Sequence, residues 1–240
     1  MMQDDSKWVN EMFSKRARDI TPAAARSAAC VLHAPISAEP EAAKRSASLL
    51  SDHERERSQR FLTPQLKTHF EQRRAFRRYC GALALGSTAP LSQVVFEEIE
   101  NGRPYLRDRP DLWFSFSSCR SGFIGAWSSR YGLGVDLEDQ KIDIEVGELA
   151  KMYFTESETR TVRERGPDRL RTFLQLWSLK EAALKSIGQG LPFGLDVFEF
   201  ELRRSVRVVD APRNHGGPKR FSAHVFDQLN VCAALVLRAF

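Results

Sequence analysis

The sequence predicts an α+β fold with two halves, and three observations support this. Apolar and polar residues alternate around Asp136, which indicates a strand that is buried on one face. Apolar residues recur at spacings of three and four over residues 170–187, without an internal Gly or Pro, which indicates a long helix. Such patterns follow one another along the 240 residues with no low-complexity run or long Gly and Ser linker. We therefore expect two halves that pack tightly together.

The first half is expected over residues 29–130, after an N-terminal extension of residues 1–28. Its strands are predicted near residues 29–36, 94–99, 112–116 and 123–127, and its helices near 52–61 and 64–85. In the extension, only residues 8–18 carry an amphipathic helical pattern. We expect this helix to pack as an arm, or else the segment to be partly disordered.

The second half is expected over residues 131–240 and begins with the Asp136 strand. Helices are predicted near residues 146–154, 156–164 and 167–187, and strands near 197–202, 206–209, 220–225 and 231–237. Gly188 and Gly190 should end the long helix. A loop with several Gly and Pro residues is expected over residues 211–218.

Composition limits the possible classes of protein. The net charge of +5 favours acidic partners, but the basic residues are mixed with acidic ones and form no recognised nucleic-acid motif. The four cysteines lack CxxC spacing, so we expect reduced thiols in a cytoplasmic protein. No stretch approaches the ~18 to 20 apolar residues of a membrane span, and the N-terminus lacks the apolar core of a secretory signal. We expect neither nucleic acid nor membrane as a partner.

Three carboxylates and two lysines form the candidate site. Asp136 and Glu138 alternate with apolar residues and so point the same way from one strand. Glu181 and Lys185 lie four residues apart on one helix face, with Lys180 beside them. A hard cation such as magnesium takes oxygen ligands and a substrate phosphate, whose other oxygens suit lysines. Spacing alone does not distinguish this site from a solvated Glu–Lys pair and the wet face of a strand.

The order of these motifs resembles that of the 4'-phosphopantetheinyl transferase superfamily. Residues 134–138 (GVDLE) are similar to the strand motif of the family, and residues 177–185 (WSLKEAALK) are similar to its helix motif. The short holo-acyl-carrier-protein synthases are trimers of about half this length. The chain is more similar to the surfactin-synthetase-type members, which are single chains. The resemblance thus implies a pseudo-twofold pair of similar α+β halves and a monomer.

By this resemblance, the protein transfers the 4'-phosphopantetheine group of coenzyme A to a serine of an apo carrier protein, acyl or peptidyl. The reaction releases 3',5'-ADP and depends on magnesium. Asp136, Glu138 and Glu181 would hold Mg²⁺ in the second half. Lys185 would stabilise charge on the pyrophosphate, and Lys180 would be a further contact to coenzyme A. Such chemistry needs positioning and charge neutralisation more than covalent help.

The base that accepts the serine proton is left open by the sequence. For the reaction that the resemblance implies, the candidates are Glu181, Glu158 and a water bound to the metal. Glu158 belongs to residues 154–158 (FTESE), which are similar to a further family motif. Thr155 and Glu158 also form a capping box that would begin the next helix, which explains the glutamate without any chemistry.

Weaker motifs extend the resemblance over residues 50–200, beginning with an early helix at residues 50–57 followed by Phe61. The implied contacts to coenzyme A are Arg73 in the next helix, Gly102, Arg103 and Pro104 in a loop, and Ser117 and Ser118 in a strand. Arg103 replaces the usual lysine and keeps its charge. Asn101 and Gly102 are also a typical hairpin turn.

Ser118 departs from the family pattern, which usually has a histidine here. By resemblance that imidazole contacts the 3'-phosphate of coenzyme A, whereas a serine donates one hydrogen bond and carries no charge. Coenzyme A then binds more weakly, or Arg120 compensates, or Ser118 is an ordinary turn residue.

Two other classes of function fit parts of the pattern. A catalytically weakened binding module for coenzyme A or the carrier protein would keep the fold. A basic nucleic-acid or membrane-surface protein would make the motif match accidental. The retained carboxylates and Lys185 favour the enzyme.

Overall fold

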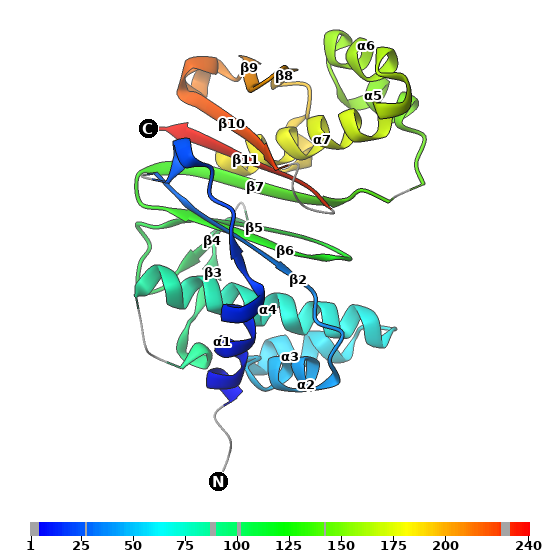
Figure 1. Ribbon diagram of the computed structural model, residues 1–240. Helices are drawn as coiled ribbons and strands as arrows, with labels where there is room; N and C mark the ends of the chain where they lie inside the picture. The colour runs from blue at the N-terminus through cyan, green and yellow to red at the C-terminus, as the bar shows by residue number, and fades with distance from the viewer. Residues whose placement is uncertain (1–4, 27, 87–89, 100–101, 142, 227–230) are drawn as a thin grey trace.

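Two antiparallel sheets lie at the centre of the protein and pack face to face (Figure 1). In the first sheet the strand order is β1 (Arg18–Asp19), β2 (Cys30–Pro35), β6 (Gly122–Ser128) and β5 (Trp113–Cys119). In the second sheet the order is β10 (Phe221–Phe226), β11 (Val231–Ala239) and β7 (Tyr131–Asp139). This computed structural model describes residues 5–26, 28–86, 90–99, 102–141, 143–226 and 231–240. The combination of helices and sheets confirms the predicted α+β class.

Apolar side chains from both sheets fill the space between them. Val31 of β2, Val135 of β7 and Leu235 of β11 are all fully buried in this layer. Because successive side chains of a strand point to opposite faces, Asp136 and Glu138 point out of this layer. They therefore face the helix that covers the second sheet.

Four helices lie on the outer side of the first sheet. They are α1 (Asp5–Arg16), α2 (Pro40–Ser48), α3 (Asp52–Gln59) and α4 (Pro64–Leu85). Of these, α4 and α1 contact the sheet, and α2 and α3 pack against α4. The longest, α4, begins with a Thr63 side chain that accepts from the Leu66 amide and ends at Gly86 in the left-handed conformation (φ 59°). A small hairpin of β3 (Phe96–Glu98) and β4 (Pro104–Leu106) lies beside its C-terminal part.

Three helices and a hairpin complete the second half. They are α5 (Val146–Tyr153), α6 (Glu156–Glu164), α7 (Arg169–Ser186), and β8 (Glu199–Leu202) with β9 (Val206–Asp210). Helix α7 packs closely on β7 at Gly134. A Cβ atom at this position would lie only 1.9 Å from the carbonyl oxygen of Ala182, so the close approach requires glycine. Gly188 follows α7 with a φ of 72°, so the predicted end of this helix is confirmed.

The two sheets meet along a seam between β5 and β7, through side chains of β5. The Trp113 Nε1 donates to the carbonyl oxygen of Leu133 (2.6 Å), and the Ser115 hydroxyl accepts from the amide of Val135 (3.1 Å). Further along β5, Ser117 reaches Asp136. The seam therefore brings the serine-rich strand of the first half to the acidic strand of the second.

The N-terminal extension packs against both halves. Val9, Met12 and Phe13 of α1 are buried in the core of the first half, and β1 pairs with β2. Ala25 is buried in the layer between the sheets. The predicted helix is thus present and packs as an arm. No helix within the described ranges is long and apolar enough to cross a membrane.

Candidate active site

Asp136 lies at the seam and is almost fully buried, with 1% of its surface exposed. Its Oδ1 accepts from the Ser117 hydroxyl (2.8 Å) and from the Lys185 ammonium (2.7 Å). Its Oδ2 is buried without a hydrogen bond to any described residue. An unpartnered buried carboxylate oxygen is costly, so the interpretation of Asp136 as the wet face of a strand is wrong.

Lys185 comes from the last turn of α7 and joins three elements. Its Nζ donates to Asp136, to the carbonyl oxygen of Val135 (3.2 Å) and to Ser117 (3.3 Å), and lies 3.5 Å from Glu181. Burial lowers the pKa of Lys185, but the carboxylates of Asp136 and Glu181 outweigh it and raise the pKa. The lysine is therefore held in its charged form, and the Glu–Lys pair is more than a solvated surface pair.

The remaining carboxylates carry an excess of negative charge. Burial, followed by the charges of Asp136 and Glu181, raises the pKa of Glu138 to about 7. Burial and the charge of Asp136 also raise the pKa of Glu181. Three carboxylates thus interact with the positive charge of Lys185, and their surplus of negative charge favours a bound proton or a further cation.

The predicted three-ligand metal site is not assembled in this arrangement. Among the residues that the structure describes, no three His, Cys, Asp or Glu side chains are placed to hold a metal ion together. The donor set still suits a hard cation, because it offers carboxylate oxygens, a buried unpartnered Oδ2 on Asp136 and raised carboxyl pKa values.

Lys180 and Glu158 form a second ion pair, and it lies in the interior of the second half. Their side chains are 0% and 1% exposed, and Nζ lies 2.7 Å from the Glu158 Oε2. The lysine also donates to the carbonyl oxygens of Leu195 (3.0 Å) and Phe198 (2.5 Å). Glu158 accepts from the amide of Phe200 (2.9 Å).

These contacts correct two expectations. Lys180 was expected to contact coenzyme A, and Glu158 was expected to be a possible base, but neither side chain reaches the surface or the Asp136 cluster. Glu158 also closes the capping box with Thr155, as the alternative interpretation held. Lys180 and Glu181 are consecutive in the sequence, which suggested a shared site. On a helix, however, consecutive side chains point in different directions, and Lys180 enters the core.

Ser118 points towards α4, on the side of β5 opposite to Ser117. Its cross-strand partner is Phe123, whose ring lies 5.1 Å from the ring of His69 on α4. The His69 Nε2 donates to the carbonyl oxygen of Cys119 (2.8 Å). An imidazole from α4 therefore lies beside Ser118, the position where the resemblance implies a histidine.

Sequence patterns did not single out His69, because its contacts with β5 are 50 positions away. Arg120, the residue considered as a substitute, is 85% exposed, and its Nε lies 3.8 Å from Asp139. Its charge is therefore directed to solvent and to a carboxylate.

Arg73 lies one turn after His69, in a helix segment rich in arginine. Burial and the charges of Arg74 and Arg57 lower its pKa, and its Nε has no hydrogen bond to a described residue. Arg77, one turn further, stacks over the Phe116 ring at 5.1 Å. Burial and the other arginines lower the pKa of Arg77 to about 10. This face of α4 thus carries positive charge that an anion would stabilise.

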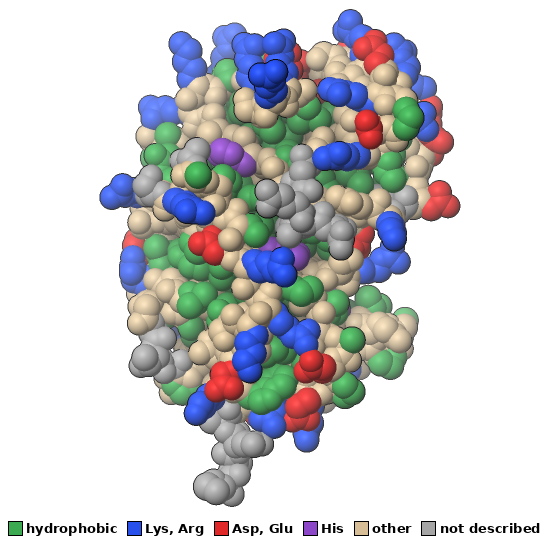
Figure 2. Space-filling view, viewed as in Figure 1, with side chains coloured by type: hydrophobic (Ala, Val, Ile, Leu, Met, Phe, Trp, Pro, Cys, Tyr) green, Lys and Arg blue, Asp and Glu red, His purple; other side chains and the backbone are tan. Residues whose placement is uncertain are grey.

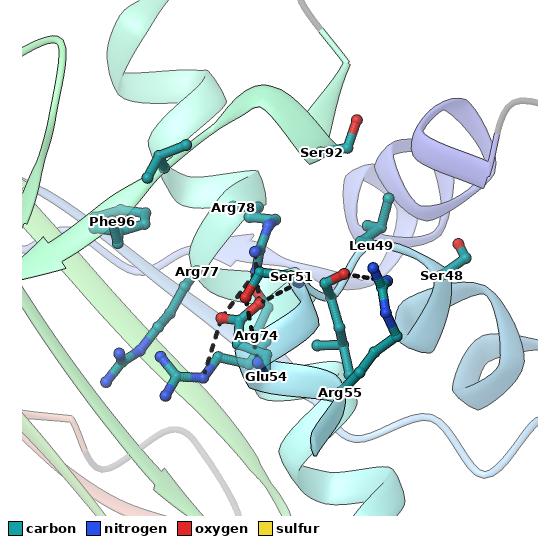
Figure 3. A pocket seen from close by; sticks show the side chains of 12 residues that line it. Ser48, Leu49, Ser51, Glu54, Arg55, Arg74, Arg77, Arg78, Ser92 and Phe96 are labelled. Carbon is teal, nitrogen blue, oxygen red and sulfur yellow. Dashed lines mark hydrogen bonds and ion pairs between the residues drawn. The ribbon is translucent and has the colours of Figure 1, made fainter. Parts of the chain in front are cut away.

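A small cavity of about 360 Å³ adjoins this part of α4 (Figure 3). Glu54 of α3 lies at its centre and pairs with Arg78 (2.7 Å) and Arg74 (3.5 Å). In Figure 3, Arg77 points away from this group. Glu54 therefore neutralises part of the charge of the cavity. Arg77 also lines the cavity, but its guanidinium stacks on Phe116 of β5 and pairs with Glu98 (3.6 Å).

The loop residues predicted to contact coenzyme A lie in the β3–β4 hairpin. Gly102 has a φ of 81°, as a tight turn requires, and Pro104 begins β4. Asn101 lies outside the described residues. The Arg103 guanidinium stacks on Trp113 at 4.1 Å, which is about 13 Å along β5 from Ser117. The structure therefore does not bring this loop together with the Asp136 cluster, and its contact with coenzyme A stays a prediction.

Comparison with known proteins bears on this arrangement. A family model described as the 4'-phosphopantetheinyl transferase superfamily matches residues 132–236, which include α7 and all of β7 except Tyr131. The second half of the chain is therefore similar to this superfamily. The matched segment holds Asp136, Glu138, Glu181 and Lys185, whereas Ser117 and His69 come from the preceding half.

Three bacterial relatives within the superfamily are similar over longer stretches. A 4'-phosphopantetheinyl transferase of Bacillus subtilis (strain 168) is 29% identical over 77% of this chain and 88% of its own length. A second from Bacillus subtilis is 32% identical over 59% of this chain and 63% of its own. One from Bacillus pumilus is 29% identical over 60% of this chain and 62% of its own. The chain thus spans under two thirds of the length of two of these relatives.

Proposed function

We propose that this protein transfers the 4'-phosphopantetheine group of coenzyme A to a serine of an apo acyl or peptidyl carrier protein. The observation that carries the proposal is the buried cluster of Asp136, Lys185 and Ser117 at the seam between the halves. A buried charged cluster with a surplus of carboxylates is typical of a functional site. The relatives above are named for this activity.

In the proposed reaction, the carrier serine oxygen bonds to the β-phosphorus of coenzyme A. The bond between this phosphorus and the oxygen bridging it to the α-phosphate breaks, and 3',5'-ADP leaves with the electron pair. Lys185, which is held charged by its neighbours, stabilises the charge that develops on the pyrophosphate. Glu181 accepts the serine proton, since burial and the charge of Asp136 raise its pKa and so make it a stronger base, whereas Glu158 is buried elsewhere.

Mg²⁺ is part of the proposal, and Asp136, Glu138 and Glu181 are the residues that would hold it. The ion would neutralise charge on the pyrophosphate. Lys185 balances part of the charge of Asp136 and Glu181.

Coenzyme A recognition is proposed to include the first half of the protein. Arg73 supplies a guanidinium and His69 an imidazole near Ser118, where the family has a histidine. We propose that the 3'-phosphate lies against this part of α4. This arrangement favours the second interpretation of Ser118, compensation by a basic neighbour, with His69 in place of Arg120. Ser118 itself lies within β5 and not in a turn.

The experiment is to incubate the protein with Mg²⁺, coenzyme A and an apo carrier protein and to weigh the carrier by mass spectrometry. We expect a gain of about 340 Da, the mass of the transferred group. Asp136→Asn should abolish the gain while circular dichroism shows an intact fold. No gain on any of several acyl and peptidyl carriers would reject the proposal. Coenzyme A binding without transfer would support the alternative, a catalytically weakened binding module. A monomer in the cytoplasm remains our proposal for its state and location.

A further inference from the structure

A large groove lies on the side of the protein away from the seam between β5 and β7. It is lined by residues 18–22 of the N-terminal extension, 202–206 of the β8–β9 hairpin and all of β10, residues 221–226. Its volume is about 1040 Å³, at the upper end of the range for small-molecule sites. None of the residues of the Asp136 cluster lines it.

The groove runs along two free strand edges. In the part of the chain that the structure describes, β10 pairs only with β11, and β1 pairs only with β2, so each is the edge of its sheet. An edge strand presents unpaired backbone N–H and C=O groups. An extended peptide can pair with such an edge, and side-chain pockets then provide specificity.

The floor of the groove is apolar and its rim is basic. Val206, Val208 and Val225 are partly buried against the core of the second half and line the groove. Arg18 and Arg204 are exposed on its rim. Figure 2 shows Lys and Arg gathered on the upper part of the molecule, where Figure 1 places the β8–β9 hairpin.

The positive charge of the rim is mostly uncompensated. Arg203 pairs with Glu201 (2.6 Å), but Arg18, Arg26 and Arg204 form no ion pair with any described residue. Asp19 is the acidic residue among those that line the groove, and its Oδ1 accepts from the amide of Thr21. The surface therefore complements a negatively charged ligand.

We propose that this groove binds an extended acidic segment of a partner protein, which pairs with the free edge of β10. Alternating apolar and acidic residues would place apolar side chains on the valines and carboxylates on the arginine rim. Six residues of such a segment span about 20 Å, the length of β10. The site is separate from transfer and does not depend on the proposed reaction.

The test uses the full-length protein and a fluorescein-labelled peptide of four Val-Glu repeats, with fluorescence anisotropy as the readout. We expect saturable binding below about 1 mM. The double variant Arg18→Ala and Arg204→Ala should raise Kd about five- to tenfold, because two exposed charge contacts are lost. The matched control is Arg163→Ala, an exposed arginine on α6 outside the groove, which should leave Kd unchanged.

Backbone pairing is tested with two further peptides, N-methylated on the odd or on the even residues. Only one set of amides can face β10, so one peptide should lose binding and the other should keep it. Equal binding of both peptides, or of a Val-Lys peptide, would overturn the proposal. Tighter binding of a single-stranded oligonucleotide of equal charge would point to nucleic acid instead and would also overturn it. So would the absence of any binding by a folded protein.

Discussion

Replacing Glu158 by Gln should destabilise the protein strongly, because it leaves the Lys180 ammonium buried without a counter-ion. The pair is 2.7 Å apart, and both side chains are at most 1% exposed. Removing one partner of such a pair costs about 3 to 5 kcal/mol. The lysine keeps its hydrogen bonds to the carbonyl oxygens of Leu195 and Phe198, so we expect the free energy of unfolding to fall by about 3 kcal/mol, at the lower end of this range.

The measurement is urea unfolding of Glu158→Gln, Lys180→Met and the double variant. The double variant removes both charges and leaves no unpaired ion. Its loss in free energy of unfolding should therefore be about 2 kcal/mol smaller than the sum of the losses of the two single variants. Glu148→Gln is the matched control. Its pair with Lys151 has the same length of 2.7 Å but is 71% and 66% exposed, and the loss should stay below about 1 kcal/mol.

A loss below about 1 kcal/mol in Glu158→Gln would refute the structural role of this pair. A variant of normal stability that had lost transfer would show instead that Glu158 takes part in the chemistry.

Three further predictions concern the seam and the ligand sites. Gly134→Ala should cost about 3 kcal/mol or more in urea unfolding, because its Cβ would meet the Ala182 carbonyl. In the folded protein the pKa of Glu138 is raised from 4.5 to about 7, so between these pH values the folded state binds a proton that the unfolded state has released. Without divalent metal, the free energy of unfolding should therefore fall as the pH rises from 4.5 to about 7. Mg²⁺ should then raise the melting temperature more near pH 8 than near pH 6, and an equal rise would reject Glu138 as a ligand. His69→Ala should weaken coenzyme A binding in calorimetry, and adding Ser118→His should restore it; no change in either would exclude His69 from the phosphate site.

Much of the fold could be predicted because local patterns and tertiary packing agree. Helix α4 has Thr63 before it and Gly86 after it, and its bounds match the predicted residues 64–85. Helix α2 and the short strands β1 and β4 were missed. Strands of two or three residues are too short to show periodicity, and α2 is rich in alanine and polar residues rather than in a regular apolar stripe.

The candidate site was predicted in part. Periodicity gave the shared direction of Asp136 and Glu138, but not the burial of Asp136, which depends on the seam with Ser117. The helical pattern of α7 also gave no means of distinguishing the environment of Lys180 from that of Lys185. Only tertiary structure shows that one lysine enters the core and the other meets the seam.

The central claim is that these two lysine–carboxylate pairs have different roles, one structural and one in transfer. The measurement that tests it most directly is the transfer rate of Glu158→Gln/Lys180→Met against that of Lys185→Met, below the unfolding temperature of both. We predict that the first variant stays within about tenfold of the natural protein, whereas Lys185→Met loses about 10²- to 10³-fold. Near-normal transfer by Lys185→Met, or loss of transfer by a folded Glu158→Gln/Lys180→Met protein, would contradict the claim.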